Sequence, residues 1–509
     1  MASKSRPQIE FGDFQTPPDL AAEVCSLIVR TGFQPATVIE PSCGRGSFVA
    51  AAVAVFPTAS TILGFEVNPT YAESARQHIP LNGAGPAVSI HTSDFFHTDW
   101  ARFMSALPDP MLVVGNPPWV TNAALGVLGS DNLPVKTNRA NLRGIDALTG
   151  KSNFDISEWM LRQNLTWLSG REGMLAVLCK TAVARKVLEY AWSARLPIAE
   201  AALYRIDAMQ HFGAAVDACL LVVHTHPGAS SQSCRDFPSL TAAIPTGTFG
   251  LRDGQMVAEV DGYERWMELA ASDPQGWRSG IKHDCSKVFE LAKDGDQYRN
   301  GLGERVSLEP GMVFPLLKSS DLAHDRAAAP RRWLVVPQRS VGEDTRSLPL
   351  VAPLTWQYLT DHTSLLEHRG SSIYRGRPRF SIFGVGPYTF TPWKVAISGL
   401  YKRLRFVEVG PHEGQPVVLD DTCYIYPCGS AEECREVAAL LRSQPAQEFF
   451  SARIFWDAKR PITARLLNQL DLGILAQYLG RERVTTHSGQ YSPAGNDEHV
   501  EQLRFLRER

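Results

Sequence analysis

Met111-Leu-Val-Val-Gly-Asn-Pro-Pro-Trp119 is an apolar run that ends in an amide, two prolines and an aromatic ring. The apolar part predicts a buried strand, and the prolines end it because they cannot continue a sheet ladder. Ligands of open α/β sheets bind at this carboxyl end of the strands. The side-chain oxygen of Asn116 and the carbonyl of Pro117 are therefore placed to accept the hydrogens of an amino group, while Trp119 stacks on the ring that carries it.

Three strand-like segments upstream also end in carboxylates. These are Glu40 after 37–39, Glu66 after 61–65 and Asp94 shortly after 88–91. Glycines 44 and 46 follow the first of them and let the backbone approach a ligand, and an acid there favours a cationic amino-acid group over a phosphate. The interval from Glu40 to Glu66 is close to that of the acid that binds ribose hydroxyls in nucleotide-binding folds. Since parallel strands end at one edge of a sheet, these side chains and Asn116 are predicted to surround one site.

The composition limits the class of protein. A chain of 509 residues exceeds one ordinary core, so two or more domains are expected. Its net charge of -2 excludes a uniformly basic surface, so any nucleic-acid face must be local. The nine cysteines contain no Cys-x-x-Cys pair, which favours a reducing compartment without structural disulfides or a metal site. There is no apolar run of roughly 18 residues and no signal-peptide core, so we expect a cytoplasmic protein without a membrane association.

Five motifs, taken in order, resemble those of adenine-N6 DNA methyltransferases of restriction–modification systems, in the arrangement of their gamma class. They are Phe14-Gln-Thr-Pro-Pro18, Glu40-Pro-x-x-Gly-x-Gly-x-Phe48, Glu66-x-Asn-Pro69, Asp94-Phe95 and Asn116-Pro-Pro-Trp119. The resemblance implies S-adenosylmethionine as cofactor and an α/β fold. A Rossmann-like methyltransferase domain with a mixed, mainly parallel seven-stranded sheet is expected over 1–228. A linker at 227–233 then leads to a mixed α+β target-recognition domain over 229–509.

The same resemblance assigns site residues. Those expected to bind the cofactor are Phe14, Gln15, Thr16, Pro17, Glu40, Pro41, Gly44, Gly46, Glu66, Asp94, Phe95 and Asn116. Within this set Glu40 contacts the methionine part, Glu66 holds the ribose, and Asp94 with Phe95 holds the adenine. The expected catalytic residues are Asn116, Pro117, Pro118, Trp119 and Phe212. Phe212 precedes the strand-like segment 218–224, where the family places an aromatic ring on the extruded adenine. The alternative interpretation is that Phe212 is an ordinary phenylalanine of the hydrophobic core.

Two basic stretches are candidates for contacts with duplex DNA. The first, over 120–151, is rich in Asn, Gly and Leu, and is interpreted as a flap that grips the substrate or as a loose insertion. The second, over 369–406, has no Asp or Glu and interleaves basic with aromatic residues, as phosphate contacts and stacking require. An alternative interpretation of this stretch is a solvated basic face that covers an aromatic core. The residues expected to contact DNA are Lys136, Arg139, Arg375, Arg377, Arg379, Lys402 and Arg403.

The expected reaction is methylation of an exocyclic amine. When Asn116 and Pro117 accept both amino hydrogens, the nitrogen can become tetrahedral and attack a sulfonium methyl in line, so catalysis is mostly positioning. The target base must leave the duplex to reach the cofactor. Cytosine-C5 methylation is excluded, because the only Pro-Cys dipeptide, Pro427-Cys428, lies far downstream.

Several alternatives stay open. Cytosine-N4 methylation shares the chemistry of the amine. An RNA or protein-glutamine methyltransferase is a second alternative, disfavoured by the long basic and aromatic second half. A catalytically silent DNA-binding subunit is a third. A restriction endonuclease encoded separately is a candidate partner, and the oligomeric state and recognition sequence are open.

Overall fold

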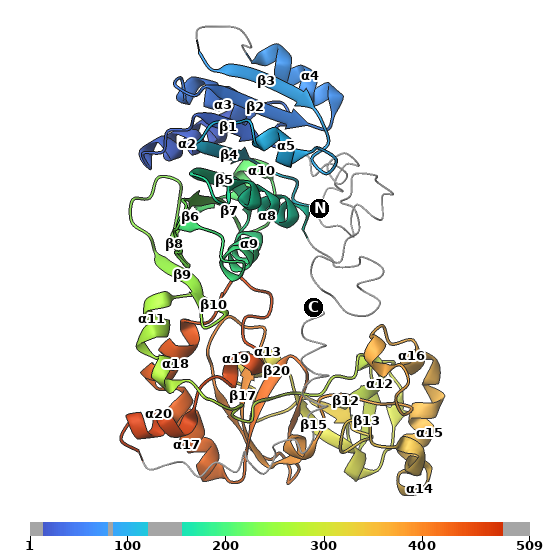
Figure 1. Cartoon of the computed structure of the whole chain (residues 1–509). Coiled ribbons are helices and arrows are strands. Elements are labelled where there is room, and N and C mark those ends of the chain that lie inside the picture. Colours follow the sequence, from blue (N-terminus) through green and yellow to red (C-terminus); the bar gives the residue numbers. More distant parts are fainter. Residues whose placement is uncertain (1–13, 80–84, 121–154, 482–509) are drawn as a thin grey trace. The chain divides into compact units, whose positions relative to one another are not determined.

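The computed structural model describes residues 14–79, 85–120 and 155–481. The chain divides into two compact units, one up to Val260 and one from Asp261 onward (Figure 1). Among the described residues, no helix is both long and apolar enough to cross a membrane.

In the described part of the first unit, one sheet of ten strands has the order β10-β9-β8-β6-β7-β5-β4-β1-β2-β3. The strands are β1 (Thr37–Glu40), β2 (Thr61–Glu66), β3 (Ala87–Thr92), β4 (Met111–Gly115), β5 (Gly173–Lys180), β6 (Ile198–Ile206), β7 (Ala218–Thr225), β8 (Ser233–Phe237), β9 (Gly247–Arg252) and β10 (Gln255–Val257). Strands β1 to β5 are parallel, and β7 runs antiparallel between β5 and β6. The seven strands from β6 to β3 confirm the Rossmann-like fold.

The sheet is larger than predicted, and the unit ends later than the expected boundary at residue 228. β8 pairs in parallel with β6 from Ala202↔Arg235 to Tyr204↔Phe237, and β9 and β10 continue the sheet as antiparallel neighbours. Two stacked rings, Tyr204 and Phe237, join β6 to β8 with their centroids 4.6 Å apart. The segment 227–233, predicted as a linker, therefore lies inside the first unit, where it connects β7 to β8 and includes the first residue of β8.

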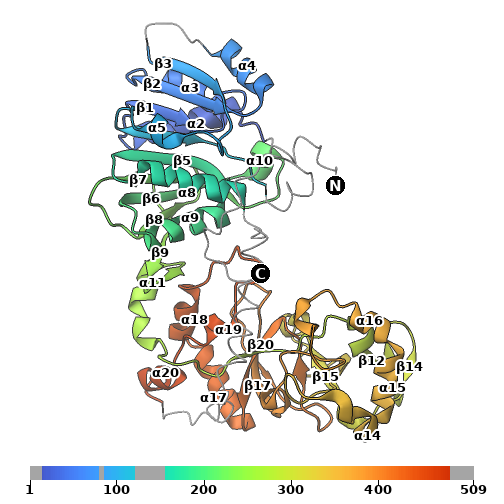
Figure 2. The ribbon, with the colours of Figure 1, turned by 45° about the vertical axis from the view of Figure 1, so that its right-hand side comes forward.

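Helices cover both faces of this sheet (Figures 1 and 2). They are α2 (Pro18–Arg30), α3 (Ser47–Val55), α4 (Pro69–His78), α5 (Trp100–Met104), α8 (Ile156–Leu168), α9 (Thr181–Ser193) and, in the β6–β7 hairpin, α10 (Ala208–Phe212). Neighbouring residues of β2 show the two faces. A side chain at Gly64 would come within 3.1 Å of Val49 in α3, whereas the Phe65 ring packs 4.8 Å from Trp100 in α5. Burial on both faces explains why these strands are continuous apolar runs.

The second unit is a mixed α+β unit, as expected. Its described strands form a sheet of order β11-β20-β17-β18 and a sheet of order β14-β13-β12-β16-β15-β19. They are β11 (Arg278–Ser279), β12 (Glu290–Asp294), β13 (Gln297–Asn300), β14 (Arg305–Val306), β15 (Val313–Leu317), β16 (Arg332–Val335), β17 (Trp393–Ser398), β18 (Val407–Val409), β19 (Val418–Leu419) and β20 (Cys423–Cys428). The α-helices are α11 (Val260–Arg265), α12 (Ser286–Phe289), α13 (Ser319–Ala323), α14 (Leu348–Val351), α15 (Pro353–Asp361), α16 (Thr363–Glu367), α17 (Ala431–Leu441), α18 (Gln444–Ser451), α19 (Ala464–Leu467) and α20 (Leu472–Tyr478).

Residues 465–479 carry apolar side chains at helical spacing, but they form two short helices, α19 and α20. Between α19 and α20, the Asn468 side chain accepts from the backbone N–H of Trp277 at 2.9 Å and donates to its carbonyl at 3.2 Å. Asp471 then caps α20 by accepting from two backbone N–H groups. A tertiary contact and a cap interrupt an apolar periodicity that is continuous in the sequence.

Candidate active site

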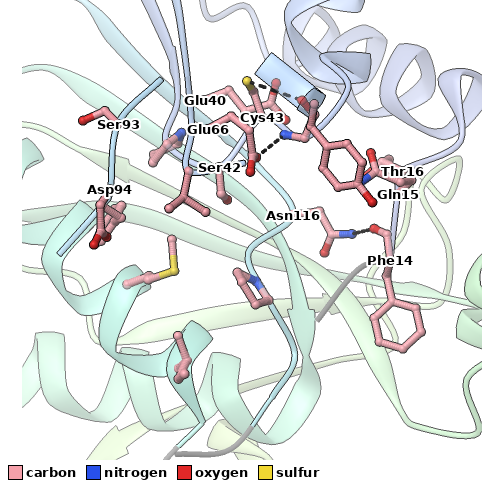
Figure 3. A pocket seen from close by; sticks show the side chains of 18 of the residues that line it. Phe14, Gln15, Thr16, Glu40, Ser42, Cys43, Glu66, Ser93, Asp94 and Asn116 are labelled. Atoms are coloured by element: carbon pink, nitrogen blue, oxygen red, sulfur yellow. Dashed lines mark hydrogen bonds between the residues drawn. The ribbon is translucent and has the colours of Figure 1, made fainter. Parts of the chain in front are cut away.

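A pocket lies at the carboxyl ends of β1, β2 and β4 and beside the segment that follows β3 (Figure 3). The predicted residues that line it are Phe14, Gln15, Thr16, Glu40, Pro41, Gly44, Glu66, Asp94, Phe95, Asn116 and Pro118. Figure 3 shows Asp94 toward one end, Phe14 toward the other and Asn116 between them. Two other predicted residues flank the pocket, since Pro17 and Gly46 stand at the N-caps of α2 and α3.

The turn after β1 is fixed by a carboxylate from the next strand. The two oxygens of Glu66 accept from the backbone N–H groups of Gly44 and Asn68, each at 2.8 Å. Gly44 has φ +53°, and a side chain there would come within 2.7 Å of the Gln15 amide oxygen. Gly46 has φ +86°, and its side chain would meet Ile79 at 2.6 Å. Both positions therefore require glycine, the first beside the pocket and the second for helix packing.

Glu40 is the most deeply buried carboxylate of the pocket, with 3 % of its surface exposed. Burial raises its pKa well above the ordinary range, the backbone N–H of Val49 at 3.1 Å opposes this, and the charge of Glu66 adds to it. A buried carboxylate becomes favourable when a cation pairs with it. The pocket is therefore suited to a ligand that brings a positive charge to Glu40.

Hydrogen bonds and packing orient Asp94 and Phe95, which also line the cofactor part of the pocket. Asp94 accepts from the Phe96 backbone N–H at 2.9 Å, and its other oxygen lies 2.6 Å from Nδ1 of His97. Phe95 is 7 % exposed, and its carbonyl accepts from the Trp100 indole at 2.7 Å. The Phe95 ring also packs against Trp167, 5.5 Å between centroids. Both residues therefore keep their orientation before any ligand arrives.

Asn116 is oriented by the N-terminal segment. Its Nδ2 donates to the carbonyl of Phe14 at 3.1 Å (Figure 3). Its Oδ1 is buried, and within the described part of the chain it has no hydrogen-bond donor. Two contacts fix the segment itself, because Ser47 donates to the Thr16 carbonyl at 2.8 Å and Arg45 donates its backbone N–H to Gln15 at 3.2 Å. The arrangement leaves one acceptor in place for a donor that the described residues do not supply.

Three rings meet beside Asn116. The centroid of Trp119 lies 5.8 Å from that of Phe14 and 5.2 Å from that of Phe212, and Phe14 and Phe212 are 6.1 Å apart. Trp119 is 6 % exposed and its indole donates to the Leu178 carbonyl at 3.4 Å. Phe212, the last residue of α10, is half-buried. The structure thus brings the predicted Phe212 to the catalytic stretch, in which Pro117 is buried.

Part of the pocket lining had no signal in the sequence. Ile156 and Met160 reach it from α8, and Tyr71 reaches it from α4. The Arg45 guanidinium lies over the Tyr71 ring, 5.0 Å from its centroid. An amphipathic pattern predicts that such residues are buried, and only the packing of the helices shows that they face a pocket.

The predicted DNA contacts have different surroundings. Lys136 and Arg139 lie outside the described residues. Arg375, Arg379, Lys402 and Arg403 are exposed, and Arg377 is half-buried with its guanidinium 5.7 Å from the Phe383 ring. Arg379 also donates to the Thr363 hydroxyl at 2.7 Å.

Two other cations of the same basic stretch are structural. Arg369 stacks 3.6 Å from the Tyr374 ring centroid and donates to the Ser381 carbonyl at 2.7 Å. Lys394 is completely buried, and burial lowers its pKa to about 7. Part of the stretch is therefore packed inside the second unit, and part is an exposed basic face.

No protein-family model matches the chain. One similar protein is the type II methyltransferase M.NspV of Nostoc sp., which is 42 % identical over 474 residues, 93 % of this chain and 98 % of M.NspV. The chain belongs to the type II methyltransferases. It is therefore a DNA methyltransferase of the restriction–modification type, and S-adenosylmethionine is its cofactor, as predicted.

Two further similarities cover different lengths. The type II methyltransferase M.CvrRI of Paramecium bursaria Chlorella virus XZ-6E is 32 % identical over 110 residues, 22 % of this chain and 25 % of M.CvrRI. Among solved structures, the type IIL restriction–modification enzyme MmeI in complex with DNA matches with a TM-score of 0.48 and 12 % identity. That match covers 97 % of this chain and 72 % of MmeI.

Proposed function

We propose that this type II methyltransferase transfers a methyl group to the N6 amine of an adenine flipped out of duplex DNA. The observation that carries the proposal is the Asn116 side chain. Its Nδ2 is engaged by the Phe14 carbonyl, and its buried Oδ1 has no donor among the described residues. A buried acceptor of this kind matches an amino hydrogen of a planar base.

The residues around the pocket fit S-adenosylmethionine. Glu40 would pair with the amino group of the methionine part, Glu66 would accept from the ribose hydroxyls, and Asp94 would accept from the adenine amine. Ile156 and Met160 supply apolar surface in the same pocket. When bound, the cofactor supplies an electrophilic methyl group on a sulfonium.

The catalytic turn, residues 116–119, would activate the amine by position. The lone pair of an exocyclic amine is delocalised into the ring, which makes it a poor nucleophile. Asn116 Oδ1 and the Pro117 carbonyl accept the two hydrogens, so the nitrogen becomes tetrahedral and its lone pair is directed at the methyl group. Successive prolines fix two φ angles, and Pro118 also restricts the ψ angle of Pro117, which sets the direction of its carbonyl. The proton leaves the nitrogen after transfer.

Phe212 is proposed to stack on the flipped adenine, with Trp119 beside it. Aromatic rings are suited to this because each base offers a π-face. The second unit is proposed to recognise the target sequence, and a separately encoded restriction endonuclease is the proposed partner of the whole chain.

Exposed cations of the second unit are proposed to bind the DNA phosphates. Changing Arg375, Lys402 and Arg403 together to Gln should weaken DNA binding and flatten its salt dependence. The slope of log affinity against log salt falls by about 0.9 for each phosphate that the protein no longer neutralises. The matched control is Arg405→Gln, because Arg405 is held by Asp325 in an ion pair. An equal decrease of the slope in control and triple variant would remove these residues from the proposed interface.

One experiment tests the reaction as a whole. The purified chain is incubated with labelled S-adenosylmethionine and a duplex library of random sequence, and the products are digested to nucleosides and also sequenced as single molecules. N6-methyladenine at one recurring motif is the expected product. N4-methylcytosine would refute the assignment of the base, and the absence of any methylated nucleoside would refute the proposed transfer.

A further inference from the structure

An ion pair lies directly behind the catalytic turn. Lys180 is the last residue of β5, and its Nζ donates to the carbonyl of Trp119 at 3.1 Å and to Asp155 Oδ2 at 2.6 Å. The side chains of Lys180 and Asp155 are 27 % and 10 % exposed. Charge-assisted hydrogen bonds in such a shielded position are roughly twice as strong as neutral ones. The last carbonyl of the turn is therefore held by a shielded, charged donor.

The partner of Lys180 is itself fixed. The other oxygen of Asp155 accepts from the backbone N–H of Ser157 at 3.1 Å and from its hydroxyl at 2.5 Å, which makes Asp155 the N-cap of α8. The next residue, Ile156, donates its N–H to the Val120 carbonyl at 2.9 Å. The start of α8 and the end of the catalytic turn are thus joined at two neighbouring points, and Ile156 lines the pocket.

We infer that Lys180 is a positioning residue for methyl transfer, acting through the Trp119 carbonyl on the direction of the Asn116 and Pro117 oxygens. This inference rests on the proposed function. The prolines between Trp119 and Asn116 have fixed φ angles, so a displaced Trp119 carbonyl shifts the whole turn. A displacement of about 1 Å at a reacting centre lowers a rate on the order of a hundredfold.

The charge of the pair also suits the reaction. The amine becomes cationic as the methyl group attaches, and an isolated ammonium group near it would oppose that charge. Asp155 neutralises Lys180, so the donor to the turn is strong while the pair adds no net charge. Removal of Lys180 alone would leave Asp155 without its cation in a position that is mostly shielded from water.

The test compares Lys180→Met with Lys180→Arg and with Lys186→Met. Lys186 is the matched control, because it pairs with Glu158 at 3.4 Å between the helices α8 and α9 and is 58 % exposed. Lys180→Met should lower the single-turnover rate at saturating cofactor by about ten- to a hundredfold, as expected when a charged hydrogen bond is removed. Its affinity for S-adenosylmethionine, measured by calorimetry, should stay within about twofold. Lys180→Arg should recover part of the rate, and Lys186→Met should stay within about twofold of the wild type.

Hydrogen exchange provides a readout that does not depend on activity. The backbone amides of Asn116, Trp119 and Val120 should exchange faster in Lys180→Met and not in Lys186→Met, while Pro117 and Pro118 have no amide hydrogen to report. If Lys180→Met fails to fold, Asp155→Asn, which retains an acceptor for Ser157, should show the same separation of rate from cofactor affinity. A rate within about twofold of the wild type, equal decreases in the two Met variants, or a parallel decrease in cofactor affinity would overturn the inference. If the wild type transfers no methyl group to DNA, the proposed function fails. Unchanged amide exchange in the catalytic turn of Lys180→Met would separately show that Lys180 does not hold this turn in place.

Discussion

The two ends of the pocket differ in how their buried polar atoms are satisfied. At the cofactor end, Glu66 already accepts from the backbone N–H groups of Gly44, in the turn after β1, and of Asn68, and Asp94 accepts from that of Phe96. At the catalytic end, Asn116 Oδ1 is buried and has no donor in the described part of the chain. A buried acceptor without a partner destabilises a fold by roughly 1–3 kcal/mol. The first end is thus organised in advance to bind, and the second retains an unmet hydrogen bond that an incoming amine completes.

Asn116→Ala is the strongest test of this difference. The change removes the acceptor and leaves the carboxylates of the cofactor end untouched. The single-turnover rate should fall by about a hundredfold or more, because one preorganised group at a reacting centre contributes about that much. Binding of S-adenosylmethionine, measured by calorimetry, should survive, with a decrease in affinity far smaller than the decrease in rate. A variant that retains more than about a tenth of the wild-type rate would place the activating group elsewhere.

Asp94→Asn tests the cofactor end. The amide oxygen can still accept from the Phe96 N–H, while the new NH₂ group replaces the acceptor proposed for the adenine amine. Cofactor affinity should fall by about ten- to a hundredfold, and the rate at saturating cofactor should stay close to that of the wild type. His97→Ala is the control, since it removes only the neighbour at 2.6 Å. Equal decreases of cofactor affinity in both variants would mean that Asp94 acts by stabilising its loop and not by binding the cofactor.

Phe212→Ala should have a smaller effect on duplex DNA. Stacking contributes about 1–3 kcal/mol per base, so a decrease of about tenfold in transfer rate is expected. Fluorescence of 2-aminopurine at the target position should also change. Phe212→Leu separates stacking from packing, because leucine keeps an apolar contact with Trp119 and Phe14. Full recovery of rate and fluorescence in the leucine variant would make Phe212 a core residue.

The pocket also shows how far sequence reasoning reaches. Glu40, Glu66, Asp94 and Asn116 were predicted to meet because each lies at or just after the carboxyl end of a parallel strand, and these strands pair with one another in neighbouring registers. The contact from Asn116 to the Phe14 carbonyl was not predictable, since a backbone oxygen 102 residues away carries no signal in the side-chain pattern. The cofactor and the fold followed from motif order, whereas the orientation of the amide required coordinates.

The extra strands show a different limit. β8 to β10 are short, and only one residue in β10 is fully buried. β8 pairs with the outer edge of β6, and β9 and β10 extend the sheet from it. The contact between Lys180 and Asp155 was not predictable for a related reason. The two residues lie 25 residues apart in the chain, and nothing in the sequence pairs their side chains.

Glu40→Gln gives the smallest effect and tests the cofactor end through pH. Burial raises the pKa of Glu40 well above its ordinary range, so between the ordinary glutamate pKa of about 4.3 and the raised value the folded protein binds a proton that the unfolded chain releases. The stability that this proton contributes is fully present below the ordinary pKa and is lost as the pH rises through the raised one. Glutamine remains neutral, so the cofactor-free variant should lose less stability than the wild type on going from pH 5 to 8, a difference of a few degrees in the unfolding midpoint.

Binding of the cofactor should have the opposite pH dependence, because it favours the charged form of Glu40. The proposed pairing requires the carboxylate form of Glu40, so wild-type affinity for S-adenosylmethionine should increase with pH until the raised pKa is passed, with release of a proton on binding. Glu40→Gln should bind more weakly and without that proton release, which calorimetry in two buffers of different ionisation enthalpy measures. The control is Glu73→Gln, because Glu73 is 58 % exposed and paired with Arg76 on the surface. If Glu40→Gln binds S-adenosylmethionine as tightly as the wild type at pH 8, the cation of the cofactor does not lie at Glu40. The cofactor end would then not be organised by its carboxylates to bind this cation, and the contrast with the catalytic end would be smaller than the hydrogen bonds indicate.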